Sequence, residues 1–178
     1  MVADAAAVPS IFLDDNESIE GVVGKPSELS NVTTKDDGVV VAIGDNRTRL
    51  AVLGGIEQAA TIVHESAVVS DSATLGSGTV VFAGAVINTC ATLGIGCIVN
   101  TGATVDHDCQ LADGVHISPG ANLGGNVTVG ECSWIGIGAC VKHGVTIGNN
   151  AIVGAGAAVV NDIPDNVTVV GVPAKERT

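Results

Sequence analysis

An aliphatic residue recurs at every sixth position through the middle of the chain, without an insertion. The series is Val63, Val69, Leu75, Val81, Ile87, Leu93, Val99, Val105, Leu111, Ile117, Leu123, Val129, Ile135, Val141, Ile147, Val153 and Val159. A small or compact residue follows four positions after most of them, as at Ala85, Cys97 and Cys109. A period of six fits neither the 3.6-residue turn of a helix nor the alternation of a simple strand. It fits one short strand and one turn per repeat.

Three such repeats close a triangular coil of 18 residues, and stacked coils pair their backbones at about 4.8 Å. We expect the aliphatic residue to fill the prism and the compact residue, including Cys97 and Cys109, to fill the space beside each turn. A glycine directly after the aliphatic residue, as at Gly94 and Gly130, is expected at the tight corner. The predicted fold is mainly β, a parallel β-helix over residues 62–163.

The charge balance excludes two broad classes. The chain of 178 residues carries 19 Asp and Glu against 7 Lys and Arg, for a net charge of −12. A nucleic-acid binder would show a basic patch, so we expect no nucleic-acid partner. Charged residues are only 15% of the chain and the mean hydropathy is +0.48, which excludes a disordered chain.

Three features of the sequence predict a cytoplasmic protein. The amino-terminal residues lack the basic and apolar regions of a signal peptide. The uncharged stretch from Ser72 to Val105 is interrupted by polar residues and glycine, so we expect no membrane span. The five cysteines are an odd number without metal or redox spacing, as expected of free thiols in a reducing compartment.

The first sixty residues have a sequence pattern typical of a small α/β subdomain. Ile11–Leu13 reads as a short strand that ends at Asp14 and Asp15, and residues 39–43 read as a second strand. Asp45 or Asn46 then caps a helix. We therefore divide the chain into a partial α/β subdomain at 1–61, the β-helix at 62–163 and a carboxyl-terminal tail at 164–178.

Five motifs make the chain similar to a narrower family than hexapeptide-repeat proteins at large. They are Phe12-Leu13-Asp14-Asp15, Ala42-Ile43-Gly44-Asp45-Asn46, Asp106-His107-Asp108-Cys109, His116-Ile117-Ser118 and Gly171-Val172-Pro173-Ala174-Lys175. The chain resembles the sialic acid O-acetyltransferase and UDP-4-amino-sugar N-acetyltransferase family. The resemblance implies a left-handed β-helix, acetyl-CoA as co-substrate, no metal, a homotrimer, and a nucleotide-sugar site in the α/β subdomain.

The resemblance also implies the roles of single residues. His107 would be the general base, with Asp108 raising its basicity, and the Gly125 amide, 18 residues on, would bind the oxyanion. The residues expected along acetyl-CoA are Asn100, His116, Ile137, Ala155 and Lys175. The residues expected at the sugar nucleotide are Asp14, Asp15, Ile43 and Gly44.

Several of these positions have a plain structural alternative. Asp14 and Asp15 could simply form a turn, and Lys175 could belong to a solvated tail. His143 either lines the CoA cleft or faces water, and His64 is expected to be structural. The sequence leaves open whether the acceptor is an amine or a hydroxyl.

One departure from the family concerns the opening segment. The family begins with a strand and a Gly-x-x-Gly-His loop that touches the sugar nucleotide, and no such loop precedes Phe12. We therefore expect a truncated subdomain that binds the sugar nucleotide weakly.

Two other functions remain to be compared with acetyl transfer. Carbonic anhydrases of the same fold place two His 36 residues apart and a third five residues later. His107 and His143 have the first spacing, but position 148 is Gly, so a trigonal zinc site lacks its third ligand. The other alternative is a catalytically idle scaffold.

Overall fold

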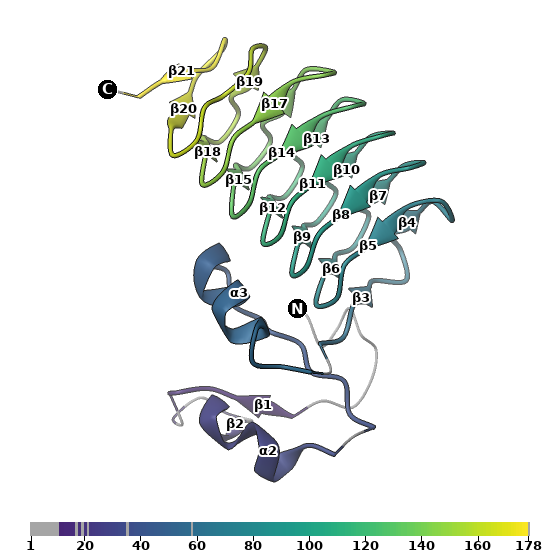
Figure 1. The fold of residues 1–178 in the computed structure, drawn as a ribbon, viewed down its shortest axis with the longest axis vertical. Helices are drawn as coiled ribbons and strands as arrows, with labels where there is room; N and C mark the ends of the chain where they lie inside the picture. The colour runs from purple at the N-terminus through teal and green to yellow at the C-terminus, as the bar shows by residue number, and fades with distance from the viewer. Residues whose placement is uncertain are drawn as a thin grey trace.

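The computed structural model describes residues 11–16, 18, 20, 22–34, 36–57 and 59–177. The first ten residues of the expected α/β subdomain lie outside this description. Figure 1 shows a column of stacked coils that carries the later part of the chain, with the amino-terminal elements gathered at its first end.

The predicted parallel β-helix is confirmed. Its strands form three sheets, and each strand pairs with the strand 18 residues away, as Val105 does with Ile87 and with Leu123. Face 1 comprises β4 (Val68–Val69), β7 (Val86–Ile87), β10 (Thr104–Val105), β13 (Asn122–Leu123), β16 (Cys140–Val141) and β19 (Ala158–Val159). Face 2 comprises β5 (Thr74–Leu75), β8 (Thr92–Leu93), β11 (Gln110–Leu111), β14 (Thr128–Val129) and β17 (Thr146–Ile147).

Face 3 is the longest sheet and extends beyond the repeats. It comprises β3 (Ile62–Val63), β6 (Val80–Val81), β9 (Ile98–Val99), β12 (His116–Ile117), β15 (Trp134–Ile135), β18 (Ile152–Val153), β20 (Thr168–Val170) and β21 (Lys175–Glu176). The strand β20 continues the parallel stacking on β18, and β21 folds back antiparallel on β20. The tail therefore closes the end of face 3.

Three lines of turns join the faces, and we name them by the faces they connect. The 1–2 corner carries residues 107, 125 and 143, the 2–3 corner carries residues 96, 114 and 132, and the 3–1 corner carries residues 137 and 155. Because each line repeats every 18 residues, residues on one corner stack along the prism axis at about 4.8 Å per coil.

The interior is filled as the period predicts. The aliphatic series from Val81 onward is buried, and so are the compact residues that follow it. Polar compact residues donate to a carbonyl of the next coil: Cys97 Sγ to Ala112 at 3.3 Å and Cys109 Sγ to Gly124 at 3.2 Å. Burial raises the pKa of the Cys97 thiol to about 12. Both cysteines are thus core residues.

The expectation about corner glycines was wrong in position. The left-handed turn residue comes three positions after the inward aliphatic residue, as at Gly114 with φ of 67°. A glycine directly after the aliphatic residue serves close packing of coils instead. A Cβ at Gly130 would lie 2.5 Å from the Asn149 amide nitrogen of the next coil.

The amino-terminal part contains two parallel strands and short helices. These are β1 (Phe12–Leu13), β2 (Val22–Gly24), the 3-10 turn η1 (Pro26–Glu28), α2 (Leu29–Val32) and α3 (Asn46–Leu53). The predicted cap of α3 is confirmed, because the Asp45 carboxylate accepts the Thr48 amide at 2.9 Å. The second strand predicted over residues 39–43 is wrong: only Val39 pairs, with Ala59. The carbonyls of Ile43 and Gly44 bind a side chain instead of a neighbouring strand.

Helix α3 packs against the 2–3 corner. A Cβ at Gly96 would lie 2.5 Å from Leu53 Cδ1 and one at Gly114 would lie 2.8 Å from Leu50 Cδ1, so the leucines touch the corner glycines. One helical turn rises 5.4 Å, close to the coil spacing of about 4.8 Å. Successive turns of α3 therefore meet successive coils.

Arg49 on α3 is fully buried. Its Nε donates to Gly96 O at 2.8 Å, Nη1 to Ile43 O and Gly44 O at 3.0 and 3.2 Å, and Nη2 to Gly114 O at 2.8 Å. Nη2 also donates to Asn46 Oδ1 at 2.9 Å. These contacts use all five N–H donors of the guanidinium. One side chain thus ties the entry to α3 to two coils of the β-helix.

We expect Arg49→Ala to lower the free energy of unfolding by roughly 3–6 kcal/mol, because buried carbonyls of Gly96 and Gly114 lose their donors. Fluorescence of Trp134, the single tryptophan, during denaturant titration measures the change. Arg47→Ala is the matched control on the same helix, since Arg47 is exposed and makes one side-chain bond, to Asn150. Equal stability of the two variants would contradict this role of Arg49.

Candidate functional site

His107 lies on the 1–2 corner, and one of its ring nitrogens is hydrogen-bonded to a neighbouring carboxylate. Its Nδ1 lies 2.7 Å from Asp108 Oδ2, and both side chains are about half exposed, at 46% and 57%. Asp108 has φ of 59°, a left-handed conformation that Asp adopts more readily than most residues. Since an ionised carboxylate only accepts, Nδ1 carries the proton and Nε2 presents its lone pair.

The electrostatics of this corner favour a basic imidazole. The hydrogen bond to Asp108 raises the pKa of His107, and the charges of Asp106 and Asp108 add to the effect. Asp106 Oδ1 in turn accepts from the His107 backbone N–H and from Asn88 Nδ2, both at 2.8 Å. The bond from Asn88 and then the bond from His107 lower the pKa of Asp106. The corner therefore holds a negative charge on either side of the base.

Gly125 lies against the His107 ring, on the coil that follows it. It is buried, and a Cβ at this position would lie 2.5 Å from His107 Nε2. Its carbonyl accepts the Gly144 amide, whereas its own N–H has no hydrogen-bond partner among the residues that the structure describes. Only glycine leaves room for the ring here, and the unpaired N–H is available to an oxygen of a ligand.

A second group of expected site residues lies on face 3. The His116 ring stacks on the Trp134 indole at 5.1 Å and 17°. Asn100 Nδ2 lies 3.2 Å from His116 Nε2, and Trp134 Nε1 donates to Ser118 Oγ at 2.6 Å. Burial, and next the charge of Arg49, lowers the pKa of His116 to about 4. His116 is therefore neutral at physiological pH.

One ring nitrogen of the neutral His116 has no hydrogen-bond partner among the described residues. If Asn100 donates to Nε2, the proton of the neutral ring sits on Nδ1. Nδ1 is buried and has no partner among the described side chains and backbone groups. A buried polar atom without a partner costs free energy, and this makes the His116 neighbourhood a candidate for ligand contact.

The remaining residues expected along acetyl-CoA lie on the 3–1 corner or at the end of face 3. Ile137 is 61% exposed and Ala155 is exposed, and neither backbone N–H has a partner in the described part of the chain. Lys175 is an exposed residue of β21. Trp134, on face 3, is 39% exposed.

The two groups do not meet within one chain. His107, Asp108 and Gly125 lie on the 1–2 corner, whereas Ile137 and Ala155 lie on the 3–1 corner. The whole width of face 1 separates these corners. The residues expected to act on one thioester therefore approach a common point only if a second copy supplies one of the two corners.

The residues expected at the sugar nucleotide lie in the amino-terminal elements. Asp14 and Asp15 follow β1 and are exposed, and Asp14 Oδ1 accepts the Asn16 amide at 2.8 Å. Ile43 and Gly44 directly precede α3, and their carbonyls bind Arg49. No hydrogen bond joins the two pairs within the described residues.

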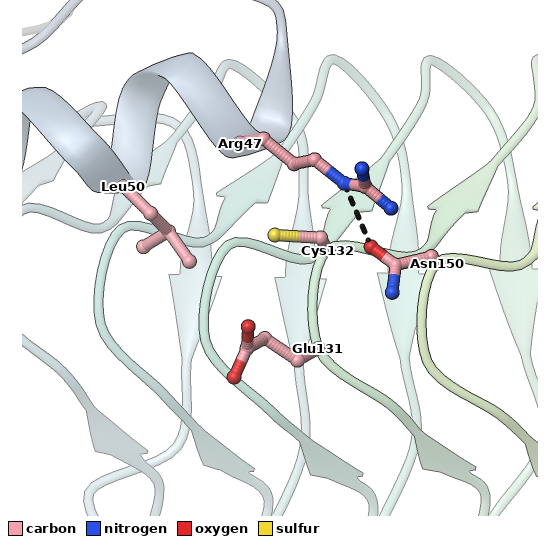
Figure 2. Close-up of a pocket in the computed structure, with 5 residues that line it drawn as sticks. All are labelled: Arg47, Leu50, Glu131, Cys132 and Asn150. Atoms are coloured by element: carbon pink, nitrogen blue, oxygen red, sulfur yellow. Dashed lines mark hydrogen bonds between the residues drawn. The ribbon is translucent and has the colours of Figure 1, made fainter. Parts of the chain in front are cut away.

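Two hollows among the described residues lie away from His107. Figure 2 shows one beside α3, lined by Arg47, Leu50, Glu131, Cys132 and Asn150, with Arg47 Nε bonded to Asn150 Oδ1 at 3.0 Å. Another lies between α2 and the segment after α3. His107 and Asp108 are instead about half exposed on their corner.

The described part of the chain lacks a metal-binding cluster and a membrane-spanning helix. Residues 11–16, 22–34, 36–57 and 59–177, with 18 and 20, contain no group of three His, Cys, Asp or Glu side chains placed to hold a metal ion. In the same part of the chain, no helix is long and apolar enough to cross a membrane.

Sequence reasoning missed two features: the hydrogen bond from Asn88 to Asp106, and the hydrogen bonds by which Arg49 joins α3 to two coils. The first has a signal in the sequence, because residues 88 and 106 are 18 apart and so lie on adjacent coils. The second has none, because Arg49 belongs to no repeat and its partners on the β-helix are backbone carbonyls.

We expect Asp108→Asn to lower the pKa of His107, because the amide no longer offers a charged acceptor to Nδ1–H. Titration of the imidazole resonances by NMR measures the shift. Asp106→Asn serves as the comparison and should lower the pKa less, since Asp106 bonds the backbone of His107 and not its ring. An unchanged His107 pKa in Asp108→Asn would contradict the assignment.

Two family profiles match parts of the chain. A family profile described as the PglD N-terminal domain matches residues 3–55, and one described as bacterial transferase hexapeptide (six repeats) matches residues 126–161. A comparison with curated protein sequences gives no match.

Solved structures match over nearly the whole chain. The acetyltransferase domain of PglB from Neisseria gonorrhoeae, in complex with acetyl coenzyme A, is 42% identical with a TM-score of 0.93, covering 99% of this chain and 91% of that one. PerB from Caulobacter crescentus, in complex with CoA and GDP-perosamine, is 39% identical with a TM-score of 0.92 and the same coverages. A histidine-to-alanine variant of GDP-perosamine N-acetyltransferase from Caulobacter crescentus is 40% identical with a TM-score of 0.87, covering 94% of this chain and 84% of that one.

Proposed function

Since the chain belongs to the sialic acid O-acetyltransferase and UDP-4-amino-sugar N-acetyltransferase family of hexapeptide-repeat acyltransferases, we propose that it transfers the acetyl group of acetyl-CoA to a nucleotide-linked amino sugar. The observation that carries the proposal is the His107 corner. There, an imidazole fixed by Asp108 stands over the unpaired N–H of Gly125.

The chemistry follows from the two free groups of this corner. His107 Nε2 accepts a proton from the sugar amine as the nitrogen attacks the thioester carbonyl carbon. The carbonyl oxygen becomes an oxyanion, and the Gly125 N–H stabilises it. The C–S bond then breaks, the amide forms, and CoA leaves. Asp106 and Asp108 stabilise the imidazolium that this transfer creates.

An amine is the acceptor that the comparisons and the electrostatics support. PerB was solved with GDP-perosamine, and a related structure is named as a GDP-perosamine N-acetyltransferase. Two carboxylates beside the base also attract the ammonium form of an incoming amino sugar more than a neutral hydroxyl, and this ammonium gives one proton to water before the neutral amine attacks. In sialic acid O-acetylation, the other activity in the family, the acceptor is a neutral hydroxyl, which these carboxylates would not attract in this way.

The acetyl-CoA arm is proposed to run along the second group of residues. His116 and Asn100 would contact the acetyl end, and the free N–H groups of Ile137 and Ala155 would bind carbonyls of the arm. Lys175 would meet the phosphates. The solved complexes of PglB with acetyl coenzyme A and of PerB with CoA support a CoA site on this fold. The sugar nucleotide is assigned to Asp14, Asp15, Ile43 and Gly44.

A homotrimer would bring the two groups together. Rotation about an axis parallel to the prism places the 1–2 corner of one protomer against the 3–1 corner of the next, at the same height. Three such contacts close, and each contains one complete site. The exposed Ile137 and the half-exposed Trp134 would then be covered. With five free cysteines, the assembly suits a reducing cytoplasm.

We expect His107→Ala to lower kcat by about 10² to 10⁴, the usual contribution of a positioned base. Release of CoA is followed with GDP-perosamine and a UDP-4-amino sugar as acceptors, and the Kd for acetyl-CoA should stay unchanged. His64→Ala is the control, since the half-buried His64 lies on the first coil and the hydrogen bonds of its ring within the described residues go to Ser66. Wild-type turnover in His107→Ala would overturn the mechanism.

Complementation tests whether the site is shared between protomers. His107→Ala disables the 1–2 corner and Ala155→Trp obstructs the 3–1 corner, so each variant alone should be inactive. Refolding the two together in equal amounts should restore about a quarter of wild-type activity, because a random pair of neighbours joins two intact corners in one case of four. Mixed trimers of confirmed mass that show no recovery would place the whole site within one chain.

A further inference from the structure

His143 is an imidazole at the candidate site to which the proposed reaction gives no role. It lies on the 1–2 corner two coils beyond His107, and it is exposed. The two ring centroids are 6.0 Å apart, with the planes tilted by 48°. Two coils rise about 9.6 Å, so the side chains lean toward one another across the coil between them.

The coil between the two rings presents Gly125. Because Gly125 has no side chain, nothing there separates the imidazoles, and a Cβ would meet the His107 ring. The corner thus places three groups in order along the prism axis: the base His107, the N–H of Gly125, and His143. An acetyl carbonyl on the Gly125 N–H would have an imidazole on either side.

The order of these groups matches the order of the reacting atoms. Ile137 and Ala155 are 12 and 30 residues beyond Gly125, so they lie about 3 and 8 Å higher along the axis, and His143 lies at about 5 Å, between them. The proposed rotation axis is parallel to the prism and preserves these heights between protomers. The CoA arm therefore leaves the carbonyl toward the level of His143, and the attacking amine lies on the His107 side.

We propose that His143 donates an imidazole N–H hydrogen bond to the thioester sulfur as the C–S bond breaks. The proposal rests on the acetyl transfer proposed above. The amine proton passes to His107, the C–N bond forms, and the electron pair of the C–S bond goes to sulfur. The N–H of His143 stabilises the resulting thiolate, which then takes a proton from water as His107 returns one.

The charged groups around His143 are compatible with a donor role. Asp106 is close enough that the charge of His143, after the larger contributions of Asn88 and His107, helps to lower the pKa of this carboxyl. Lys142 precedes His143 and is exposed. No carboxylate bonds the His143 ring among the described residues, so its N–H groups are not already engaged.

The test compares His143→Phe, which keeps an aromatic ring against His107, with His143→Gln, which keeps an N–H donor. The single-turnover rate of acetyl transfer from acetyl-CoA to GDP-perosamine or a UDP-4-amino sugar isolates the chemical step. We expect a loss of roughly tenfold in His143→Phe, recovery of most of that loss in His143→Gln, and an unchanged Kd for acetyl-CoA. His64→Phe is the matched control and should keep the wild-type rate.

A change of leaving group sharpens the test. In the oxygen-ester analogue of acetyl-CoA the leaving atom is an alkoxide, a far stronger base than a thiolate, so the loss in His143→Phe should grow to roughly a hundredfold. Three results would each overturn the role of His143. They are a wild-type rate in His143→Phe, equal losses of rate in the Phe and Gln variants, and a loss of rate that is the same for the thioester and the oxygen ester. If the wild-type protein releases no CoA with any acceptor, the proposed function itself fails, and this assignment fails with it.

Discussion

The β-helix depends on the pairing of each repeat strand with the strand 18 residues away. Val105 pairs with Ile87 below and Leu123 above, and the same register continues from β3 to β19 through all three faces. Because the repeat has no insertion, a residue's position in the sequence sets its face and its height. The relative placement of His107, Gly125 and His143 is therefore a direct product of the period, held by buried aliphatic side chains far from the chemistry.

The amino-terminal elements are joined to this column by a different kind of contact. Arg49 offers five donors to carbonyls and one amide oxygen, and it is fully buried without a carboxylate. Burial lowers its pKa, and a guanidinium stays charged even so. That charge also contributes to keeping His116 neutral. Arg49 thus bonds Ile43 and Gly44 of the proposed sugar-nucleotide site and the glycines of the 2–3 corner. Through its charge it also acts on His116, the proposed contact of the acetyl group.

The sequence predicted the β-helix because one strong periodic signal controls every coil. It also predicted the cap by Asp45, which depends only on neighbours in the chain. It failed for residues 39–43, where an apolar run resembled a strand but Arg49 takes the carbonyls that follow. The site residues remain predictions: spacing brings Gly125 to His107, whereas the approach of Ile137 depends on a second chain, which no period within one chain encodes.

The amide two positions after each inward aliphatic residue shows how one fold supplies both structure and chemistry. On the 2–3 corner, Asp113 caps the Ile95 amide and Asn149 caps the Glu131 amide, each from the next coil. On the two corners assigned to the reaction, four equivalent amides have no side-chain or backbone partner among the described residues, those of Gly125, Ile137, His143 and Ala155, whereas the amide of His107 is bonded by the neighbouring Asp106. The amides of Gly125 and Ile137, which meet His143 and Ala155 in the next coil instead of Asp or Asn, remain free donors. The proposed oxyanion and CoA contacts therefore use amides that no side chain of the next coil accepts. An Asp or Asn placed one coil above would accept a hydrogen bond from such an amide, which could then no longer bind a ligand.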